Sequence, residues 1–183
     1  MAANALRALL AAALALAACA CASSRTLGGT FSDMATGSEL SAILVADREF
    51  DYSDVDVTLY EGRVMLTGTM RSEEGRRKLL ANAWKADGVK QVIDEVLIAD
   101  KTSVGQGLED ARIDQALRAR LLSDRGVKSA NYKFSVSQGV VYILGVARDE
   151  VELDRVLNHA RSIAGVEKVV SHAVYRAQTA RVR

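Results

Sequence analysis

The segment Gly62–Gly68, GRVMLTG, decides the fold of this chain, because its pattern returns 77 residues later as Gly139–Gly145, GVVYILG. Both segments read Gly-x-Val-x-Leu/Ile-x-Gly, so apolar side chains fall on alternate residues, as in a half-buried strand. The dipeptides Glu61-Gly62 and Gln138-Gly139 introduce the segments, and glycine supplies the positive φ that a tight hairpin turn requires. A second alternating segment precedes each turn, with apolar residues at Val55, Val57 and Leu59 or at Tyr132, Phe134 and Val136. The sequence therefore predicts a β-hairpin in each half of the chain.

The repeat extends beyond the hairpins. Ten residues are identical at the constant offset of 77 over about 45 positions without a gap, which indicates an internal repeat. Behind each hairpin the apolar period becomes helical, which predicts helices over residues 73–87 and 150–164. Ser72 and Asp149 stand at their N-cap positions, and Glu152 follows Asp149 with the spacing of a capping box.

Each repeat also has an earlier helix and a final strand. Residues 110–122 carry apolar side chains at helical spacing, and residues 38–46 are the shorter counterpart in the first repeat. Gly88 and Gly165 are expected to end the second helices, and valine-rich segments follow both. The order is α-β-β-α-β, and the last strand can pair only after a helical crossover. We therefore predict an α+β fold with two tandem modules, each a small mixed three-stranded sheet packed on two helices.

This order, together with the two glycine motifs, resembles the BON domain. The hairpin motif occurs at Gly62–Gly68 and Gly139–Gly145, and Gly-Val-x-x-Val follows the second helix at Gly88–Val92 and Gly165–Val169. The resemblance covers residues 38–99 and 107–176. It leaves residues 100–106 as a linker, in which Gly105 permits mobility, and residues 177–183 as a basic C-terminal tail.

The N-terminus predicts where the protein resides. Leu9–Ala18 is an unbroken apolar run behind Arg7, too short to span a bilayer but suited to a signal-peptide core. The following Leu16–Cys19, LAAC, resembles the lipobox of bacterial lipoproteins, which implies cleavage after residue 18 and lipidation of Cys19. An ordinary secretory cleavage at Ala18 or Ala22 is the alternative.

Several acyl chains on Cys19 would anchor the protein stably, whereas one chain binds only marginally. By resemblance to the lipoprotein sorting rule, Ala20 favours the outer membrane, with the folded part facing the periplasm. Residues 19–37 are mostly small and polar with several glycines, so they predict a lipidated flexible tether. Cys21 would be the only unmodified thiol, which excludes an intramolecular disulfide framework.

Charge differs between the two halves of the chain. Residues 36–105 have a balance of −4, and residues 106–183 a balance of +4. Five basic residues on and after the first helix of the second repeat are the candidate lipid-binding set: Arg112, Arg118, Arg120, Arg125 and Lys128. Each would gain about 1 kcal/mol near an anionic surface. Alternatively, they pair with Asp110, Asp114 and Asp124, or dock on the acidic first repeat. Residues 109–124 also lack the aromatic side chain usual at a lipid interface, which counts against lipid binding.

No sequence motif indicates catalysis. The two histidines, His159 and His172, are interpreted as a helix-boundary residue and an exposed strand residue, and no metal-binding or phosphate-binding motif occurs. Asp51, Asp54 and Asp56 lack the glycine and glutamate of a calcium loop, so they predict a solvated edge. Trp84 extends an apolar helix face and is expected to pack in the core, with an exposed contact as the alternative.

Resemblance to BON proteins implies a binding module for phospholipid surfaces or envelope proteins. We therefore expect a lipoprotein without catalytic activity, cofactor, metal or nucleic-acid partner, which binds anionic phospholipid through its second module and supports envelope integrity. The alternative is a protein-interaction adaptor for an envelope assembly or secretion complex.

Overall fold

The computed structural model describes residues 27–99 and 103–176, which form two modules of the same topology. The first module contains α2 (Leu27–Ala46), β1 (Val55–Tyr60), β2 (Arg63–Met70), α3 (Glu73–Ala83) and β3 (Gln91–Ile98). The second contains α4 (Val104–Ser123), a short 3₁₀ turn (Ser129–Asn131), β4 (Tyr132–Ser137), β5 (Val140–Ala147), α5 (Glu150–Arg161) and β6 (Lys168–Tyr175). The predicted α-β-β-α-β order is confirmed in both modules.

Each module has a mixed three-stranded sheet. The strand orders are β1-β2-β3 and β4-β5-β6, with an antiparallel hairpin followed by a parallel pair after the helical crossover. The hairpin turns are equivalent as well: φ is positive at Glu61 (53°) and Gly62 (80°), and at Gln138 (53°) and Gly139 (72°). Positive φ at both central residues is the type I′ geometry, whose twist matches that of the flanking strands.

One aspartate in each module holds the hairpin turn against the first helix. Asp33 on α2 accepts hydrogen bonds from the backbone N–H groups of Glu61 (2.8 Å) and Gly62 (2.9 Å). Its equivalent Asp110 on α4 does the same, because the N–H groups of Gln138 and Gly139 each lie 2.9 Å from its carboxylate oxygens. Asp33 and Asp110 are 8% and 7% exposed, so each is a buried brace between helix and hairpin.

The predicted tether is wrong from residue 27 onward, because α2 covers Leu27–Ala46. Three glycines lie between residues 27 and 37, so the local helix propensity is low. Tertiary contacts stabilise the helix instead: Asp33 binds the hairpin, the Thr36 hydroxyl donates to the carbonyl of Asp87 at 2.6 Å, and Leu40 is fully buried. The helix predicted over residues 38–46 is therefore only the second half of α2.

The predicted linker over residues 100–106 is also too long. Helix α4 begins at Val104, after Ser103, whose side chain accepts from the N–H of Gln106 at 3.2 Å. Gly105 therefore lies inside the helix instead of permitting mobility. The predicted signal peptide (residues 1–18), the lipidation site Cys19 and the C-terminal tail (177–183) lie outside the described residues.

The second helices follow the prediction at their N-termini and end sooner than expected. The Ser72 side chain accepts from the N–H of Gly75 at 3.1 Å, and that of Asp149 accepts from the N–H of Glu152 at 2.8 Å. Helices α3 and α5 end at Ala83 and Arg161, so the two glycines expected to end them lie several residues beyond, with positive φ.

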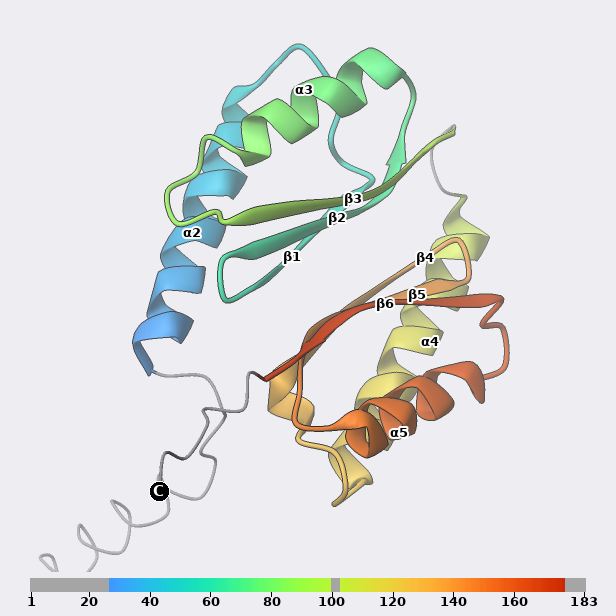
Figure 1. Cartoon of the computed structure of the whole chain (residues 1–183). Helices are drawn as coiled ribbons and strands as arrows, with labels where there is room; N and C mark the ends of the chain where they lie inside the picture. Colours follow the sequence, from blue (N-terminus) through green and yellow to red (C-terminus); the bar gives the residue numbers. More distant parts are fainter. Residues whose placement is uncertain (1–26, 100–102, 177–183) are drawn as a thin grey trace, which may run out of the picture.

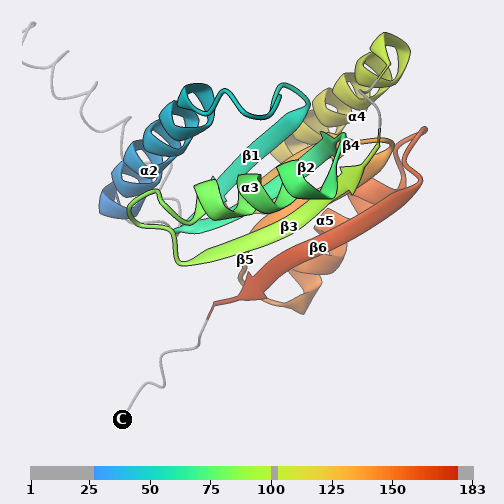
Figure 2. The same cartoon turned by 90° about the horizontal axis from the view of Figure 1, so that it is seen from above.

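The molecule has four layers. Helices α2 and α3 cover the outer face of the first sheet, the inner faces of the two sheets meet, and α4 and α5 cover the outer face of the second sheet (Figure 1). Seen from above, β3 and β6 lie on one side of this sandwich, and β1 and β4 lie on the other (Figure 2). Each module therefore has its own helix–sheet core, and the two modules share a third apolar layer. Among the described helices, none has the length and hydropathy needed to cross a bilayer.

Candidate functional site

The two sheets are joined by an apolar layer. Its buried side chains come from both modules: Tyr60, Met65 and Ile93 from the first, and Tyr142, Leu144 and Val146 from the second. Polar contacts border the layer, since the Thr67 and Ser135 hydroxyls are 2.8 Å apart and the Ser135 hydroxyl donates to the Asp56 carboxylate at 3.2 Å. The two modules are therefore packed against one another through a shared apolar layer.

The modules are related by a pseudo-twofold axis. Glu95 and His172 occupy equivalent positions 77 residues apart, and their side chains bond to each other, with Nε2 and Oε1 at 2.7 Å. A contact between equivalent residues is the property of a twofold arrangement. Arg63 strengthens the same contact, because its guanidinium donates to the carbonyl of His172 at 2.7 Å, and burial lowers the pKa of Arg63. The prediction that His172 is an exposed strand residue is wrong, because its side chain is 26% exposed and faces the other module.

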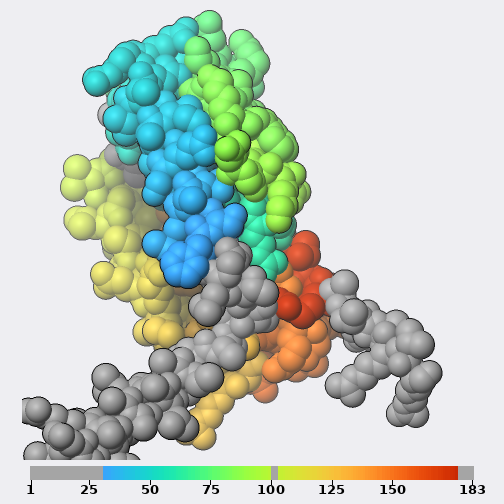
Figure 3. All heavy atoms as spheres, turned by 90° about the vertical axis from the view of Figure 1, so that its left-hand side faces the viewer, coloured from blue at the N-terminus to red at the C-terminus, as the bar shows by residue number. Residues whose placement is uncertain are grey.

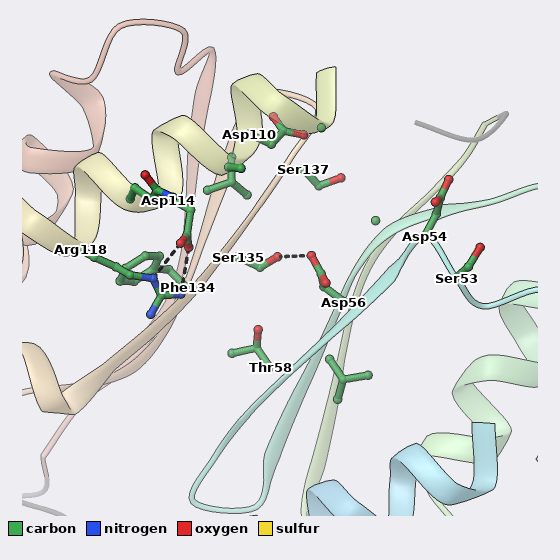
Figure 4. Close-up of a pocket in the computed structure, with 16 residues that line it drawn as sticks. Ser53, Asp54, Asp56, Thr58, Asp110, Asp114, Arg118, Phe134, Ser135 and Ser137 are labelled. Carbon is green, nitrogen blue, oxygen red and sulfur yellow. Dashed lines mark hydrogen bonds and ion pairs between the residues drawn. The ribbon is translucent and has the colours of Figure 1, made fainter. Parts of the chain in front are cut away.

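A groove runs along the side of the molecule where β1 and β4 lie. It consists of two adjoining cavities of 530 and 690 Å³, which share Val57, Thr58, Arg118 and Phe134, and we call it the inter-module groove. In Figure 4, Asp56 and Thr58 of β1 point toward β4, and Asp110, Asp114 and Arg118 of α4 line the opposite side. The carboxylate of Asp56 is bonded there to Ser135.

Four carboxylates, those of Asp54, Asp56, Asp110 and Asp114, and one guanidinium line the first cavity. Arg118 binds Asp114 through two N–H groups at 2.7 and 3.0 Å, and this hydrogen bonding raises the pKa of Arg118. The same guanidinium lies 4.8 Å from the centre of the Phe134 ring, a cation–π distance. The groove is therefore acidic, because these four carboxylates face two cations: Arg118, which is paired with Asp114, and Lys133, which lines the second cavity.

The structure brings the five predicted lipid-binding residues to one module but gives them different surroundings. Arg112 binds Glu109 at 3.0 Å and the carbonyl of Ala164 at 2.7 Å, so two of its five N–H donors are used within the module. The Arg120 guanidinium bonds to the Ser162 hydroxyl and to the carbonyl of His159, at the C-terminal end of α5. Two of the five residues therefore connect α4 to the end of α5.

Arg125 and Lys128 differ from the other three. Both are exposed, and their side chains form no ion pair or hydrogen bond with any residue in the described part of the chain. The alternative that Asp124 pairs with one of the five basic residues is not what the structure shows. Asp124 instead binds His159 at 2.7 Å and lies 3.5 Å from Arg155. That hydrogen bond to His159 holds the pKa of Asp124 below its usual range. Arg125 and Lys128 are thus two exposed cations of the module without a partner among the described residues, as are Lys133, Arg161 and Lys168.

Helix α4 has a second apolar stripe, opposite its core-facing side, and part of this stripe also borders the inter-module groove, through Ala111 and Leu122. Ile113 and Leu117 face the core, whereas Val104, Leu108 and Leu122 are 83%, 69% and 75% exposed. At 100° per residue these three residues lie on one face, with Gln115 between them, Ala111 and Ala119 on either side, and Arg112 and Arg118 on its two borders. A helix that is apolar on two opposite faces shows little amphipathic signal in its sequence, so the outer stripe was hidden by the inner one.

Helix α2 carries an equivalent stripe without the charges. Phe31, Met34 and Val45 are 69%, 64% and 72% exposed and occupy the positions of Leu108, Ala111 and Leu122. Serine and alanine replace the flanking arginines, because Ser41 and Ala35 stand where α4 has Arg118 and Arg112. Figure 3 shows α2, in blue, at the molecular surface. The two modules therefore present the same stripe with different electrostatics.

The remaining sequence candidates have structural surroundings. Trp84 is 55% exposed, so the expectation of core packing is wrong; α3 ends at Ala83, and Trp84 caps it outside the buried face. His159 lies at the helix boundary, as predicted, with its ring bonded to Asp124. Within the described ranges, no three His, Cys, Asp or Glu residues are arranged to hold a metal ion.

The fold and this surface define a protein of two pseudo-symmetric α-β-β-α-β modules. The BON domain family model matches residues 32–100 and 109–177, and the chain belongs to this family, with two copies of the domain. Both matches begin close to the bracing aspartates, six residues before the predicted first boundary and two after the second.

Several characterised and uncharacterised proteins are similar to the chain. An uncharacterised protein encoded in the gshII 5′ region of Anaplasma centrale is 34% identical over 66% of this chain and 81% of that protein. The outer membrane lipoprotein DolP of Haemophilus influenzae is 27% identical over 63% of this chain and 60% of DolP. The osmotically inducible protein Y of Escherichia coli is 26% identical over 78% and 72%. Among solved structures, CdsD of the type III secretion system of Chlamydia trachomatis is 15% identical over 76% of this chain and 91% of that chain, with a TM-score of 0.34.

Proposed function

We propose that this chain is a non-catalytic lipoprotein of the outer membrane, anchored through Cys19, facing the periplasm and supporting envelope integrity. In this proposal the second BON module binds anionic phospholipid with the outer stripe of α4 and the basic residues beside it. The lipobox resemblance and the similarity to an outer membrane lipoprotein support the location.

One observation carries the lipid contact: the exposed stripe of Val104, Leu108 and Leu122 is followed, just beyond the C-terminal end of α4, by the exposed cations Arg125 and Lys128. Burying a leucine-sized side chain is worth about 1.5–3 kcal/mol, and each basic residue near an anionic surface about 1 kcal/mol. An interfacial helix combines these two contributions. The anchor would hold the module near the membrane, where even weak contacts act at a high effective concentration.

The intramolecular bonds rank the five predicted residues. Arg125 and Lys128 should contribute most to lipid binding, because they have no ion pair to lose. Arg112 and Arg118 should contribute less, since each is already bonded to a carboxylate on α4. Arg120 should act chiefly through stability, because it caps α5.

Vesicle flotation tests this proposal. A chain from Ser24 to Arg183 retains every described helix and strand but lacks the anchor, so membrane binding would have to come from the folded part. We expect it to float with anionic vesicles at low salt, to float less at physiological salt because the charges are screened, and not to float with zwitterionic vesicles.

Variants locate the contact. Replacing Arg125 and Lys128 with glutamine should weaken binding about 30-fold, which corresponds to about 1 kcal/mol for each charge. Replacing Leu108 and Leu122 with serine should weaken it as well. The matched control is Arg48→Gln, because Arg48 is exposed and occupies the position of Arg125 in the first module. Equal losses for the control and the α4 variants, or no flotation of the parent chain, would refute the lipid contact.

A protein-interaction adaptor is the second candidate function, and α2 is the observation that favours it. Its exposed stripe of Phe31, Met34 and Val45 lacks flanking arginines, so anionic lipid has no electrostatic preference for it. Under this alternative, the flotation experiment gives no binding, and crosslinking from position 34 in cells yields a protein partner.

A further inference from the structure

The inter-module groove is bordered by two unpaired strand edges. Three consecutive residues of each strand line it: Asp56, Val57 and Thr58 of β1, and Phe134, Ser135 and Val136 of β4. Side chains of consecutive residues point to opposite faces of a sheet, so consecutive residues border the same cavity only where a strand presents its edge. In Figure 4, the groove opens between these strands and α4.

The register shows which backbone groups face the groove. The N–H of Thr69 donates to the carbonyl of Asp54 at 3.0 Å, so Asp54 and Thr69 form a hydrogen-bonded pair of the β1–β2 ladder. Such pairs alternate along an antiparallel strand, and Asp56 and Thr58 therefore also bond to β2. The N–H and C=O groups of Val57 and Leu59 point the other way, toward the groove. Throughout residues 27–99 and 103–176, no hydrogen bond to these four groups is found.

An exposed edge of this kind is a template for another strand. Natural edges are blunted by charged side chains, above all lysine, by proline or by bulges; β1 reads VDVTLY, without lysine or proline, and its one charged residue is Asp56. We propose that the inter-module groove binds an extended polypeptide segment as an added strand on β1. This proposal goes beyond the lipid contact of α4 and does not depend on it.

The charges of the groove select the sequence of the segment. Asp56 accepts a hydrogen bond from a hydroxyl, and Asp110 accepts only from amide groups, so neither carboxylate is paired with a cation within the described residues. Asp56 and Thr58 face the second module, whereas Val57 packs toward the core of the first. An added strand has the same two faces, and we infer a segment in which lysine or arginine alternates with apolar residues.

The direction of pairing determines which residues of the bound segment hydrogen-bond to β1. In an antiparallel pair, residues opposite Val57 and Leu59 exchange hydrogen bonds with them and place their side chains on the same face. Those residues would be the apolar ones, and the basic residues would lie opposite Asp56 and Thr58. Antiparallel pairing is also slightly more stable per residue than parallel pairing. The bonded N–H groups of the segment are then those of its apolar residues.

The test uses an eight-residue probe peptide of alternating lysine and valine with blocked ends, titrated to millimolar concentration against the Ser24–Arg183 chain. Amide NMR shifts and hydrogen exchange are the measurements. We expect shifts and slower exchange at Val57 and Leu59, and at least tenfold weaker binding of a peptide with glutamate in place of lysine.

N-methylated peptides test the strand addition without any change in the protein. Methylation of the backbone nitrogens of the valines should abolish binding. Methylation of the backbone nitrogens of the lysines should change the affinity by no more than about threefold. Asp56→Lys should weaken binding about tenfold through like-charge repulsion. Asp154→Lys, the same change at an exposed site on α5, is the matched control. Binding that survives both methylations, falls equally for Asp154→Lys, or leaves Val57 and Leu59 unshifted would overturn the proposal.

Discussion

Replacing Asp110 with alanine tests the role of the bracing aspartates. The carboxylate accepts from the N–H groups of Gln138 and Gly139 at 2.9 Å and from the side-chain amide of Gln106 at 3.0 Å. A hydrogen bond to a charged group contributes about 1.5–3 kcal/mol, and a buried donor left without a partner costs about 1–3 kcal/mol. The amide of Gly139 is buried, whereas that of Gln138 is partly buried and regains water. We therefore expect a loss of about 3 kcal/mol in the free energy of unfolding.

Urea unfolding of the Ser24–Arg183 chain measures this loss, and a melting curve should show a fall of roughly 6–12 °C. Asp33→Ala should produce a similar loss, because its two backbone hydrogen bonds have nearly the same lengths, 2.8 and 2.9 Å. Asp114→Ala is the control: Asp114 lies one turn after Asp110, but it forms only a surface ion pair with Arg118, worth about 1 kcal/mol or less. If Asp110→Ala loses no more stability than Asp114→Ala, the aspartate does not brace the hairpin.

Two further predictions concern the module interface and the acid range. Leu144→Arg places a charge in the fully buried layer between the sheets, so the modules should separate while their secondary structure persists. We expect a larger radius of gyration in X-ray scattering and an unchanged far-UV circular dichroism spectrum. An unchanged radius of gyration would contradict the packing of the two sheets. The pKa of Asp124 is depressed by its hydrogen bond to His159, so its stabilising effect is present above the unfolded pKa of about 3.9 and is lost as pH falls through the folded value. Asp124→Asn should therefore flatten the decline of the urea midpoint between about pH 5 and 2, and a parallel decline in both proteins would exclude this linkage.

The repeat made most of the secondary structure predictable. Strand alternation, the Gly-containing hairpins and the caps at Ser72 and Asp149 depend on residues close together in sequence, and each is confirmed. The first half of α2 was missed because its glycines oppose a helix locally. Applying the 77-residue offset to Asp110 would have found Asp33, and with it the true start of the module.

The candidate site was less predictable than the fold. Composition singled out five basic residues, but pairing is a property of tertiary neighbours, so sequence could not separate Arg125 and Lys128 from Arg118 and Arg120. The outer stripe of α4 was equally hidden, because residues on two apolar faces cancel in any one-sided helical pattern.

The sequence by itself determined that the chain repeats an α-β-β-α-β module and that nothing in it resembles a catalytic motif, because these conclusions depend on local periodicity and residue type. Only the tertiary structure decided that the modules pack sheet against sheet about the Glu95–His172 contact. It alone also decided that β1 presents an unpaired edge to an acidic groove. A strand that alternates apolar and polar residues specifies two faces, but whether its edge and its polar face meet solvent or another domain depends on residues distant in sequence.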